Sequence, residues 1–284
     1  MYPNELFNIL GLSVDLYSIC FLVGVIACFV YMRIAMKKCG YSSTASDTIL
    51  IVVMFAILIG LFSALLFQSI YDYIDSPANG FKITGRMTFI GGLIGGIVSY
   101  LAIYLIYVYI INPRLKQGNF FKSDMNKGAW YGVRFIPAGI TVAHAFGRLG
   151  CFFAGCCHGQ ITEAWYGIYN VEVGAKTVPI QLYEAIFLFA LTAVMIVLWF
   201  VFKFKYNLAV YLISYGVWRF IIEFFRADYR GDFIGDISPS QFWSIVMVIA
   251  GIIFFFLYRK YDAKFVKEEV TNPIEVESKT TIEQ

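Results

Sequence analysis

Residues 48–71 have the sequence TILIVVMFAILIGLFSALLFQSIY, which is 24 residues long and contains no charged side chain. A helix needs about 20 mostly apolar residues to cross the hydrocarbon core of a bilayer. The whole chain has a matching composition, because 60% of its 284 residues are hydrophobic, 14% are charged and the mean hydropathy is +0.71. A soluble domain has roughly 45–50% apolar and about 25% charged residues. We therefore predict an integral membrane protein; neither a disordered chain nor a water-soluble enzyme fits this composition.

Six other segments are long enough to span a membrane. Four of them are free of charge, and two, roughly residues 130–153 and 207–225, contain arginine. The four uncharged segments are residues 16–32, 87–113, 185–202 and 237–258. The pattern predicts an all-α integral membrane protein, a bundle of about seven transmembrane helices, within a domain of residues 1–262. The polar remainder, residues 263–284, is expected to be a disordered cytoplasmic tail.

Lys and Arg are distributed unequally between the predicted loops. With the N-terminus outside, the cytoplasmic segments up to Lys267 contain 13 of these residues and the outer segments contain 5. Cytoplasmic loops carry the excess of positive charge, so we predict an outside N-terminus and a cytoplasmic C-terminus. The first five residues lack Lys and Arg, and no cleavable signal peptide is expected. The sequence has no basic face with interleaved aromatic residues, so nucleic acid is not an expected partner.

Two of the predicted helices carry ionisable side chains that repeat on one face. These residues are His144, Arg148 and Cys151 in one helix and Tyr215, Arg219, Glu223 and Arg226 in the other. Ionisable groups inside a membrane usually face the bundle interior and mark function. Because a guanidinium binds phosphate oxygens through two parallel hydrogen bonds, the pattern predicts a basic pocket for a phospholipid head group. Alternatively, Arg219 and Glu223 form a structural ion pair and Arg148 extends toward the membrane surface.

Two groups of glycines accompany these features. The first group has small-xxx-small spacing, which allows close helix packing in lipid and would equally give a ligand access to the backbone. The second group flanks Arg148, where glycine lets the backbone approach a substrate or ends the helix. The residues are Gly91, Gly92, Gly95 and Gly96 in the first group and Gly147, Gly150 and Gly155 in the second.

Four stretches resemble, in the same order, the signature motifs of the bacterial prolipoprotein diacylglyceryl transferase family. The family motifs SFHGGLIG, GRxGNFxNxExxG, HPSQLYE and YGxxRFxxEFFR correspond to TFIGGLIG, GRLGCFFAGCCHG, PIQLYE and YGVWRFIIEFFR. In this sequence the four stretches are residues 88–95, 147–159, 179–184 and 215–226. Tyr17 falls where the family has a tyrosine in its first span. The resemblance covers about residues 17–259, nearly the whole chain.

The family transfers an sn-1,2-diacylglyceryl group from phosphatidylglycerol to the lipobox cysteine of a prolipoprotein. It acts at the outer face of the bacterial cytoplasmic (inner) membrane without a metal or cofactor. The resemblance therefore implies a transferase whose partners are phosphatidylglycerol, a prolipoprotein signal peptide and membrane lipids. It also implies that Arg148 and Arg219 hold the phosphate and that Tyr215 lies in the pocket. The substrate-binding residues expected are Tyr17, Gly91, Gly92, Gly147, Gly150, Cys151, Gln181, Glu223 and Arg226.

Three positions depart from the family pattern. Ile90 stands where the family has histidine, Cys151 where it has asparagine, and Cys156 where it has glutamate. The chain thus resembles a divergent branch with a GCCHG segment, and a base at position 90 is missing. His158 joins Arg148, Arg219 and Tyr215 as a catalytic candidate, because it adjoins the Arg148 stripe and histidine titrates near neutral pH. His144, which is inside a predicted span, is expected to be an interior histidine.

The cluster of Cys151, Cys156 and Cys157 allows three interpretations. First, the thiols bind a soft metal, although adjacent cysteines are not the usual C-x2-C spacing. Second, Cys156 and Cys157 form a disulfide, with each other or with another segment, at an oxidising outer face. Third, the small side chains pack at a tight helix junction. No metal ligand is assigned on this pattern. Two alternatives to the transferase remain: a paralogue that uses the lipid pocket for a different acceptor or a cysteine redox step, and a phospholipid-binding protein without turnover.

Overall fold

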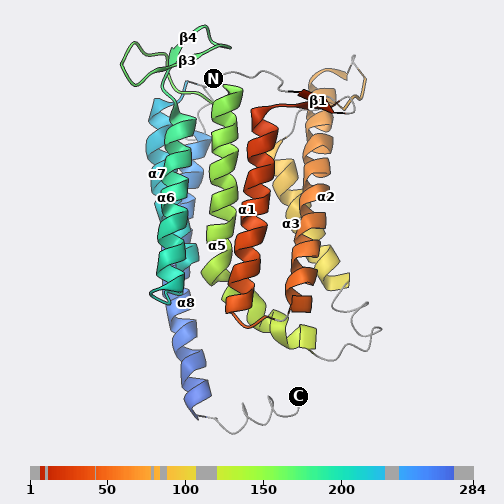
Figure 1. Ribbon diagram of the computed structural model, residues 1–284, viewed down its shortest axis with the longest axis vertical. Helices are drawn as coiled ribbons and strands as arrows, with labels where there is room; N and C mark the ends of the chain where they lie inside the picture. The colour runs from red at the N-terminus through yellow and green to blue at the C-terminus, as the bar shows by residue number, and fades with distance from the viewer. Residues whose placement is uncertain are drawn as a thin grey trace. The chain divides into compact units, whose positions relative to one another are not determined.

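The computed structural model describes residues 7–9, 12–41, 43–77, 80–83, 88–106, 120–227 and 237–271, and the structural statements below concern these residues. Seven α-helices account for most of them (Figure 1). They are α1 (Leu16–Lys38), α2 (Ser43–Asp75), α3 (Phe89–Ile106), α5 (Phe120–Ala154), α6 (Ile180–Phe200), α7 (Asn207–Ile222) and α8 (Pro239–Thr271). A single-turn 3-10 helix, η3 (Glu223–Phe225), follows α7 directly.

Six of the helices, all except α3, are long and apolar enough to cross a membrane. In α3 the described apolar stretch, Ile94–Ile106, is shorter, and the end of the predicted third span, residues 107–113, lies outside the described residues. The prediction of an all-helical protein with several membrane spans is confirmed, and its orientation stays a prediction. Helix α8 continues to Thr271. The rest of the predicted tail, residues 272–284, also lies outside the described residues.

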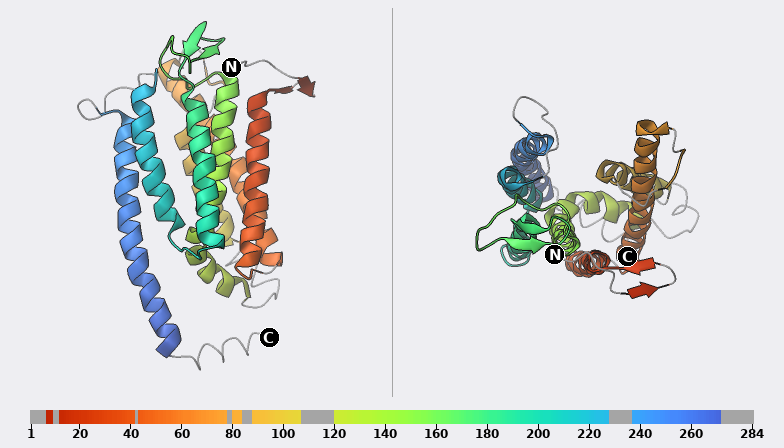
Figure 2. Two further views of the ribbon diagram at one scale, coloured as in Figure 1. Left: turned by 60° about the vertical axis from the view of Figure 1, so that its left-hand side comes forward. Right: turned by 90° about the horizontal axis from the view of Figure 1, so that it is seen from above.

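Two short antiparallel hairpins add to the helices. β1 (Phe7–Ile9) pairs with β2 (Leu12–Val14), and β3 (Ile168–Asn170) pairs with β4 (Ala175–Thr177). The sequence does not predict either hairpin, because three residues are too few to show the alternation typical of a strand. The β3–β4 hairpin occupies the connection between α5 and α6 and lies at the end of the bundle where α5 ends (Figure 2).

The chain divides into two compact units, which we describe separately. The first unit consists of residues 1–32 and 130–284, and the second consists of residues 33–129. The first unit therefore contains most of α1 and α5, the β3–β4 hairpin, and all of α6, α7 and α8. The second unit contains α2 and α3.

Glycines bring α2 and α3 together in the second unit. A Cβ atom added to Gly60 would lie 3.0 Å from the carbonyl oxygen of Gly92, and one added to Gly95 would overlap Cβ of Ser63. The Ser63 hydroxyl donates a hydrogen bond to the carbonyl oxygen of Gly91 over 2.9 Å. Small residues at such positions let two helices approach closely in lipid. Gly91 and Gly92 therefore serve helix packing, and their contact with a substrate stays a prediction.

The core of the first unit lies between α5, α6 and α7. Ala145 and Leu188 are buried against Tyr215, one residue from each of the three helices. Small residues also join α7 to α8, since a Cβ atom added to Gly216 would lie 2.9 Å from the carbonyl oxygen of Ser244. These contacts pack α5, α6, α7 and α8 together, and the charged side chains of the unit lie on the same helices.

Two helix ends have sequence-encoded caps. At the start of α8, the Ser238 backbone N–H donates to Oε1 of Gln241 over 3.1 Å, and the Gln241 N–H donates to the Ser238 hydroxyl over 3.2 Å. This is a capping box, and Pro239 at the first helical position sacrifices no helical hydrogen bond. Helix α5 ends at Ala154 because Gly155 follows with φ of +77°, the left-handed conformation in which helices commonly stop.

Candidate active site

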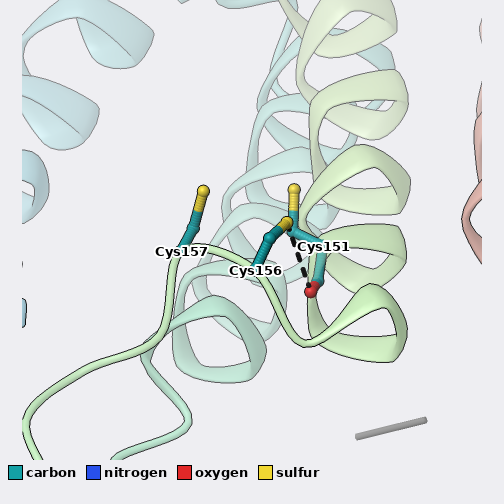
Figure 3. Close-up of side chains that lie close together, drawn as sticks. All are labelled: Cys151, Cys156 and Cys157. Atoms are coloured by element: carbon teal, nitrogen blue, oxygen red, sulfur yellow. Dashed lines mark hydrogen bonds between the residues drawn. The ribbon is translucent and has the colours of Figure 1, made fainter. Parts of the chain in front are cut away.

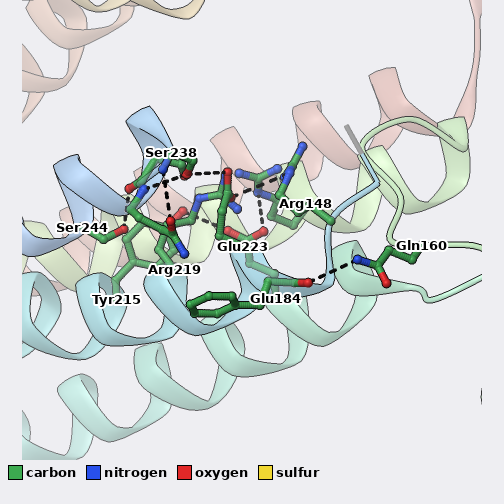
Figure 4. Close-up of polar contacts among 12 residues, drawn as sticks. Arg148, Gln160, Glu184, Tyr215, Arg219, Glu223, Ser238 and Ser244 are labelled. Carbon is green, nitrogen blue, oxygen red and sulfur yellow. Dashed lines mark hydrogen bonds and ion pairs between the residues drawn. The ribbon is translucent and has the colours of Figure 1, made fainter. Parts of the chain in front are cut away.

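Arg148, near the end of α5, is joined to two other helices through one buried carboxylate. Its Nε atom lies 3.1 Å from Oε2 of Glu184 on α6. The hydroxyl of Tyr215 on α7 donates a hydrogen bond to Oε1 of the same carboxylate over 2.9 Å (Figure 4). The Glu184 side chain is 1% exposed, whereas that of Arg148 is 19% exposed. Glu184 thus ties α5, α6 and α7 together and holds the Arg148 guanidinium at a partly open edge.

Glu184 is missing from the residues that the sequence singles out for the site. It closes the PIQLYE stretch and precedes the uncharged segment 185–202, where it is read as a boundary charge. Helix α6 begins earlier, at Ile180, so Glu184 lies one turn inside the helix and is buried. A signal was available: a buried carboxylate in a membrane span requires a cationic partner, and the same stretch already contributes Gln181.

A second charged cluster forms where α7 passes into η3. Nη2 of Arg219 lies 3.0 Å from Oε2 of Glu223, and Nε of Arg226 lies 3.8 Å from the same oxygen. The hydroxyl of Ser238, the residue before α8, donates to Oε1 of Glu223 over 3.3 Å (Figure 4). The predicted pairing of Arg219 with Glu223 is confirmed. The stripe is not one continuous α-helix, however, because α7 ends at Ile222.

The two clusters together carry an excess of positive charge. They contain three guanidinium groups, of Arg148, Arg219 and Arg226, and only two carboxylates. The charge of Glu184 also attracts Arg219, and that of Arg148 repels it. Nη1 of Arg219 is buried and has no hydrogen-bond partner among the described residues. A buried donor without an acceptor costs free energy, so this nitrogen is suited to bind an anion.

The aromatic surroundings of Tyr215 define its role. Its ring stacks on that of Tyr211 with centroids 5.7 Å apart, and it meets the ring of His144 edge-on at 5.0 Å. Its hydroxyl donates to the Glu184 carboxylate, and a hydroxyl in this role keeps its proton. Tyr215 is therefore better placed to position Glu184 than to act as a base. His144 packs as an interior ring, as expected from the sequence.

The other predicted residues lie in several places. Tyr17 on α1 is 41% exposed. Its ring packs against Gly150 of α5, where an added Cβ atom would lie 3.0 Å from Cδ2 of Tyr17. Gly150 thus permits the close contact of α1 with α5. Among the described residues, a Cβ atom added to Gly147 would have no neighbour within 4 Å, so the helix surface is open at this position. His158 is half-buried, and its Nδ1 lies 2.9 Å from the carbonyl oxygen of Gly159.

The loop after α5 is held by two buried side chains. Nδ2 of Asn170 donates to the carbonyl oxygen of Gly155 over 2.8 Å, and Nε2 of Gln181 donates to that of Cys156 over 2.6 Å. Cys157 has φ of +59°, a conformation that costs a residue with a Cβ atom roughly 1–2 kcal/mol. The loop is therefore fixed in a strained conformation that presents its cysteines.

The thiols of Cys151, Cys156 and Cys157 converge beside the end of α5 (Figure 3). Their Sγ atoms all lie within 4.8 Å of one another. None of the six cysteines is in a disulfide in this structure, and this includes Cys156 and Cys157, for which the sequence left one open. Hydrogen bonds from the thiols of Cys151 and Cys156, together with the charges of Arg148 and Arg226, lower the pKa of Cys157 below its usual value.

Known proteins match this chain over most of its length. The family model described as prolipoprotein diacylglyceryl transferase matches residues 4–257. A phosphatidylglycerol–prolipoprotein diacylglyceryl transferase of Clostridium tetani (strain Massachusetts / E88) is 31% identical over 267 residues, which cover 88% of this chain and 95% of its own. The protein of the same name from Clostridioides difficile (strain 630) is 28% identical over 268 residues, covering 93% and 98% of the two chains. The chain therefore belongs to the prolipoprotein diacylglyceryl transferase family.

Proposed function

We propose that the protein transfers a diacylglyceryl group from phosphatidylglycerol to the lipobox cysteine of a prolipoprotein and releases glycerol phosphate. The observation that carries this proposal is Nη1 of Arg219, which is buried without an acceptor among the described residues. A phosphate group supplies acceptor oxygens for this nitrogen and negative charge for a cluster with three arginines and two glutamates. The family supplies the reaction class.

In the proposed reaction, the acceptor sulfur, after losing its proton, attacks the sn-3 carbon of the diacylglycerol, which carries the phosphate ester. The C–O bond breaks and its electron pair goes to the phosphate oxygen, so negative charge develops there. Guanidinium groups that are already in place stabilise this charge without reorganising. Arg148 and Arg219 have this role, and Glu184 and Glu223 hold them in position through contacts of 3.1 and 3.0 Å.

The surface of α5 next to Arg148 is the proposed entry of the lipid head group. Gly147 precedes this arginine, and a Cβ atom there would have no neighbour within 4 Å among the described residues. The half-exposed ring of Tyr17 lies one turn further along, against Gly150. We assign Gly147 and Tyr17 to the entry of the donor lipid and Arg226 to the outer side of the phosphate.

We further propose that the site faces the outer side of the bacterial cytoplasmic membrane. The excess of Lys and Arg in the predicted cytoplasmic segments up to Lys267, 13 against 5 in the outer segments, supports an outside N-terminus. In that orientation α5 runs outward, and its C-terminal end with Arg148 lies at the outer surface. The donor lipid and the acceptor would then meet at this surface.

A reconstituted assay tests the function. Purified protein in liposomes of phosphatidylglycerol is mixed with a lipobox peptide that has one cysteine, and mass spectrometry follows the peptide and the released glycerol phosphate. We expect Arg219→Ala to lower turnover by about 10²–10³-fold, the usual effect of removing one preorganised donor. As a matched control, Arg33→Ala removes an exposed arginine that pairs with Asp47 and should leave turnover unchanged.

The other results of this assay have definite meanings. Undiminished turnover of Arg219→Ala would contradict the phosphate site. Bound phosphatidylglycerol without any product would favour a lipid-binding protein without turnover. Transfer to a different thiol but not to the lipobox would favour a paralogue, and the departures at Ile90, Cys151 and Cys156 make that the second candidate.

A further inference from the structure

We propose that Cys151, Cys156 and Cys157 form a three-thiolate site for one soft divalent metal ion of the zinc type, whose fourth coordination position takes the acceptor thiol. This inference rests on the proposed function and extends it to the deprotonation of the acceptor, a step that neither Arg148 nor Arg219 performs. It departs from the metal-free chemistry that the family resemblance implies.

The distances between the thiols are close to those of a metal site. Zinc–thiolate bonds are about 2.3 Å long, so sulfur ligands of a tetrahedral zinc lie about 3.8 Å apart. The three Sγ atoms here all lie within 4.8 Å of one another. In Figure 3 the three side chains point to the same side of the loop. The separations of the sulfur atoms therefore exceed those of a zinc site by at most about 1 Å.

The backbone explains how two adjacent cysteines can serve one ion. In an extended chain successive side chains point to opposite sides, which is why adjacent ligands are unusual. The left-handed φ values of Gly155 (+77°) and Cys157 (+59°) break this alternation. Asn170 and Gln181 then fix the loop through the carbonyl oxygens of Gly155 and Cys156. The loop therefore presents its thiols before any ion binds.

Arginine side chains near the cluster balance the charge of a metal–thiolate group. Three thiolates and a divalent ion together carry one negative charge. Arg148 and Arg226 both act electrostatically on Cys157 and compensate this charge. All three cysteines are only partly buried, so an ion can reach them from solvent. Thiolates select soft ions such as zinc over magnesium or calcium.

An open coordination position would activate the acceptor. Catalytic zinc has three protein ligands and an exchangeable fourth, and a thiol that coordinates it is deprotonated. The proton passes to solvent water, and the sulfur electron pair forms the bond to the glycerol carbon. The electron pair of the broken C–O bond leaves with the phosphate, and the oxidation state of the metal is unchanged.

Cys151 lies three residues after Arg148 on α5, so thiolate and phosphate would lie side by side. A metal-bound thiolate would not need the base that the family histidine, replaced here by Ile90, would provide.

Metal content tests the first half of the proposal. Protein equilibrated with Zn²⁺ and freed of excess ion should contain one zinc per chain by inductively coupled plasma mass spectrometry, and Cd²⁺ should give an ultraviolet thiolate-to-metal band. Cys156→Ser and Cys157→Ser should each weaken Zn²⁺ binding roughly tenfold or more. Cys39→Ser, which removes a thiol outside the cluster, should retain the ion. Wild-type protein without zinc, or with a disulfide between cluster cysteines while active, would overturn the proposal.

Turnover tests the second half and separates it from the proposed function. Metal-free protein should transfer the diacylglyceryl group about 10²-fold more slowly, as expected when the means of deprotonation is lost, and Zn²⁺ should restore the rate. Unchanged transfer by metal-free protein would overturn the role of the metal and leave the proposed function standing. Zinc binding at the cysteines without transfer in any liposome would overturn both the proposed function and the assignment of the acceptor.

Discussion

The almost completely buried carboxylate of Glu184 lies 3.1 Å from Nε of Arg148 and accepts a 2.9 Å hydrogen bond from the hydroxyl of Tyr215. Glu184→Gln keeps an acceptor for Tyr215 but leaves Arg148 without its counter-charge. We expect a loss of about 1–3 kcal/mol in the free energy of unfolding and about 10²-fold in turnover, because the guanidinium is displaced. Thermal unfolding in detergent and the transfer assay measure both. Glu163→Gln, at an exposed glutamate, is the control, and wild-type turnover in Glu184→Gln would contradict the assigned role.

Residues of the site differ in how far the sequence could predict them. Arg219 and Glu223 are four residues apart, so local helix geometry was sufficient to predict their 3.0 Å contact. The partners of Glu184 are 36 and 31 residues away along the chain, at Arg148 and Tyr215. A contact of that kind depends on how α5, α6 and α7 pack, and no periodicity within one segment encodes it. The buried carboxylate was therefore missed although both of its partners were predicted.

At the scale of an element, the end of α5 depends on one glycine. Gly155 has φ of +77°, and Gly155→Ala should cost about 1–2 kcal/mol in the free energy of unfolding. Gly40, with φ of +80°, lies between α1 and α2 and, among the described residues, has no atom within 4 Å of an added Cβ, so Gly40→Ala is a control with similar backbone strain away from the hairpin. We expect both variants to lose stability, and only Gly155→Ala to lower turnover, because it displaces the cysteine loop. Equal turnover in the two would show that the loop has no part in the reaction.

The sequence predicted the long helices but not the short strands. Uncharged segments of 17 to 27 residues identify membrane helices directly, since few other structures need them. The two arginine-containing helices, α5 and α7, were found by the same length criterion. The β3–β4 hairpin was missed because its strands have three residues each. Yet that hairpin supplies Asn170, which holds Gly155, so a short element without a sequence signal contributes to the site.

At the scale of the whole molecule, lipid replaces water as the surroundings of the apolar surface. On α1, the side chains of Leu22, Ile26 and Val30 are 58%, 53% and 54% exposed and recur on one face. In water such a face would be an association site or an aggregation hazard, and in a bilayer it needs no partner. Polar residues such as Gln181 and Asn207 are instead buried in the first unit. The composition of the chain predicted this inversion; the partners of its buried polar groups required the structure.

The orientation of the bundle can be tested with two cysteine substitutions at exposed charged residues. Glu172 lies between β3 and β4, beyond the end of α5, and Lys260 lies near the opposite end of the chain on α8. If the loops with more Lys and Arg are cytoplasmic, a membrane-impermeant maleimide should label Glu172→Cys in intact cells. It should label Lys260→Cys only after the membrane is permeabilised. The unmodified protein, with its six native thiols, gives the background labelling. Labelling of Lys260→Cys alone in intact cells would contradict the predicted topology and place Arg148 and the cysteine cluster on the cytoplasmic side. Both proposed substrates, the lipid and the thiol, would then have to reach the site from within the cell.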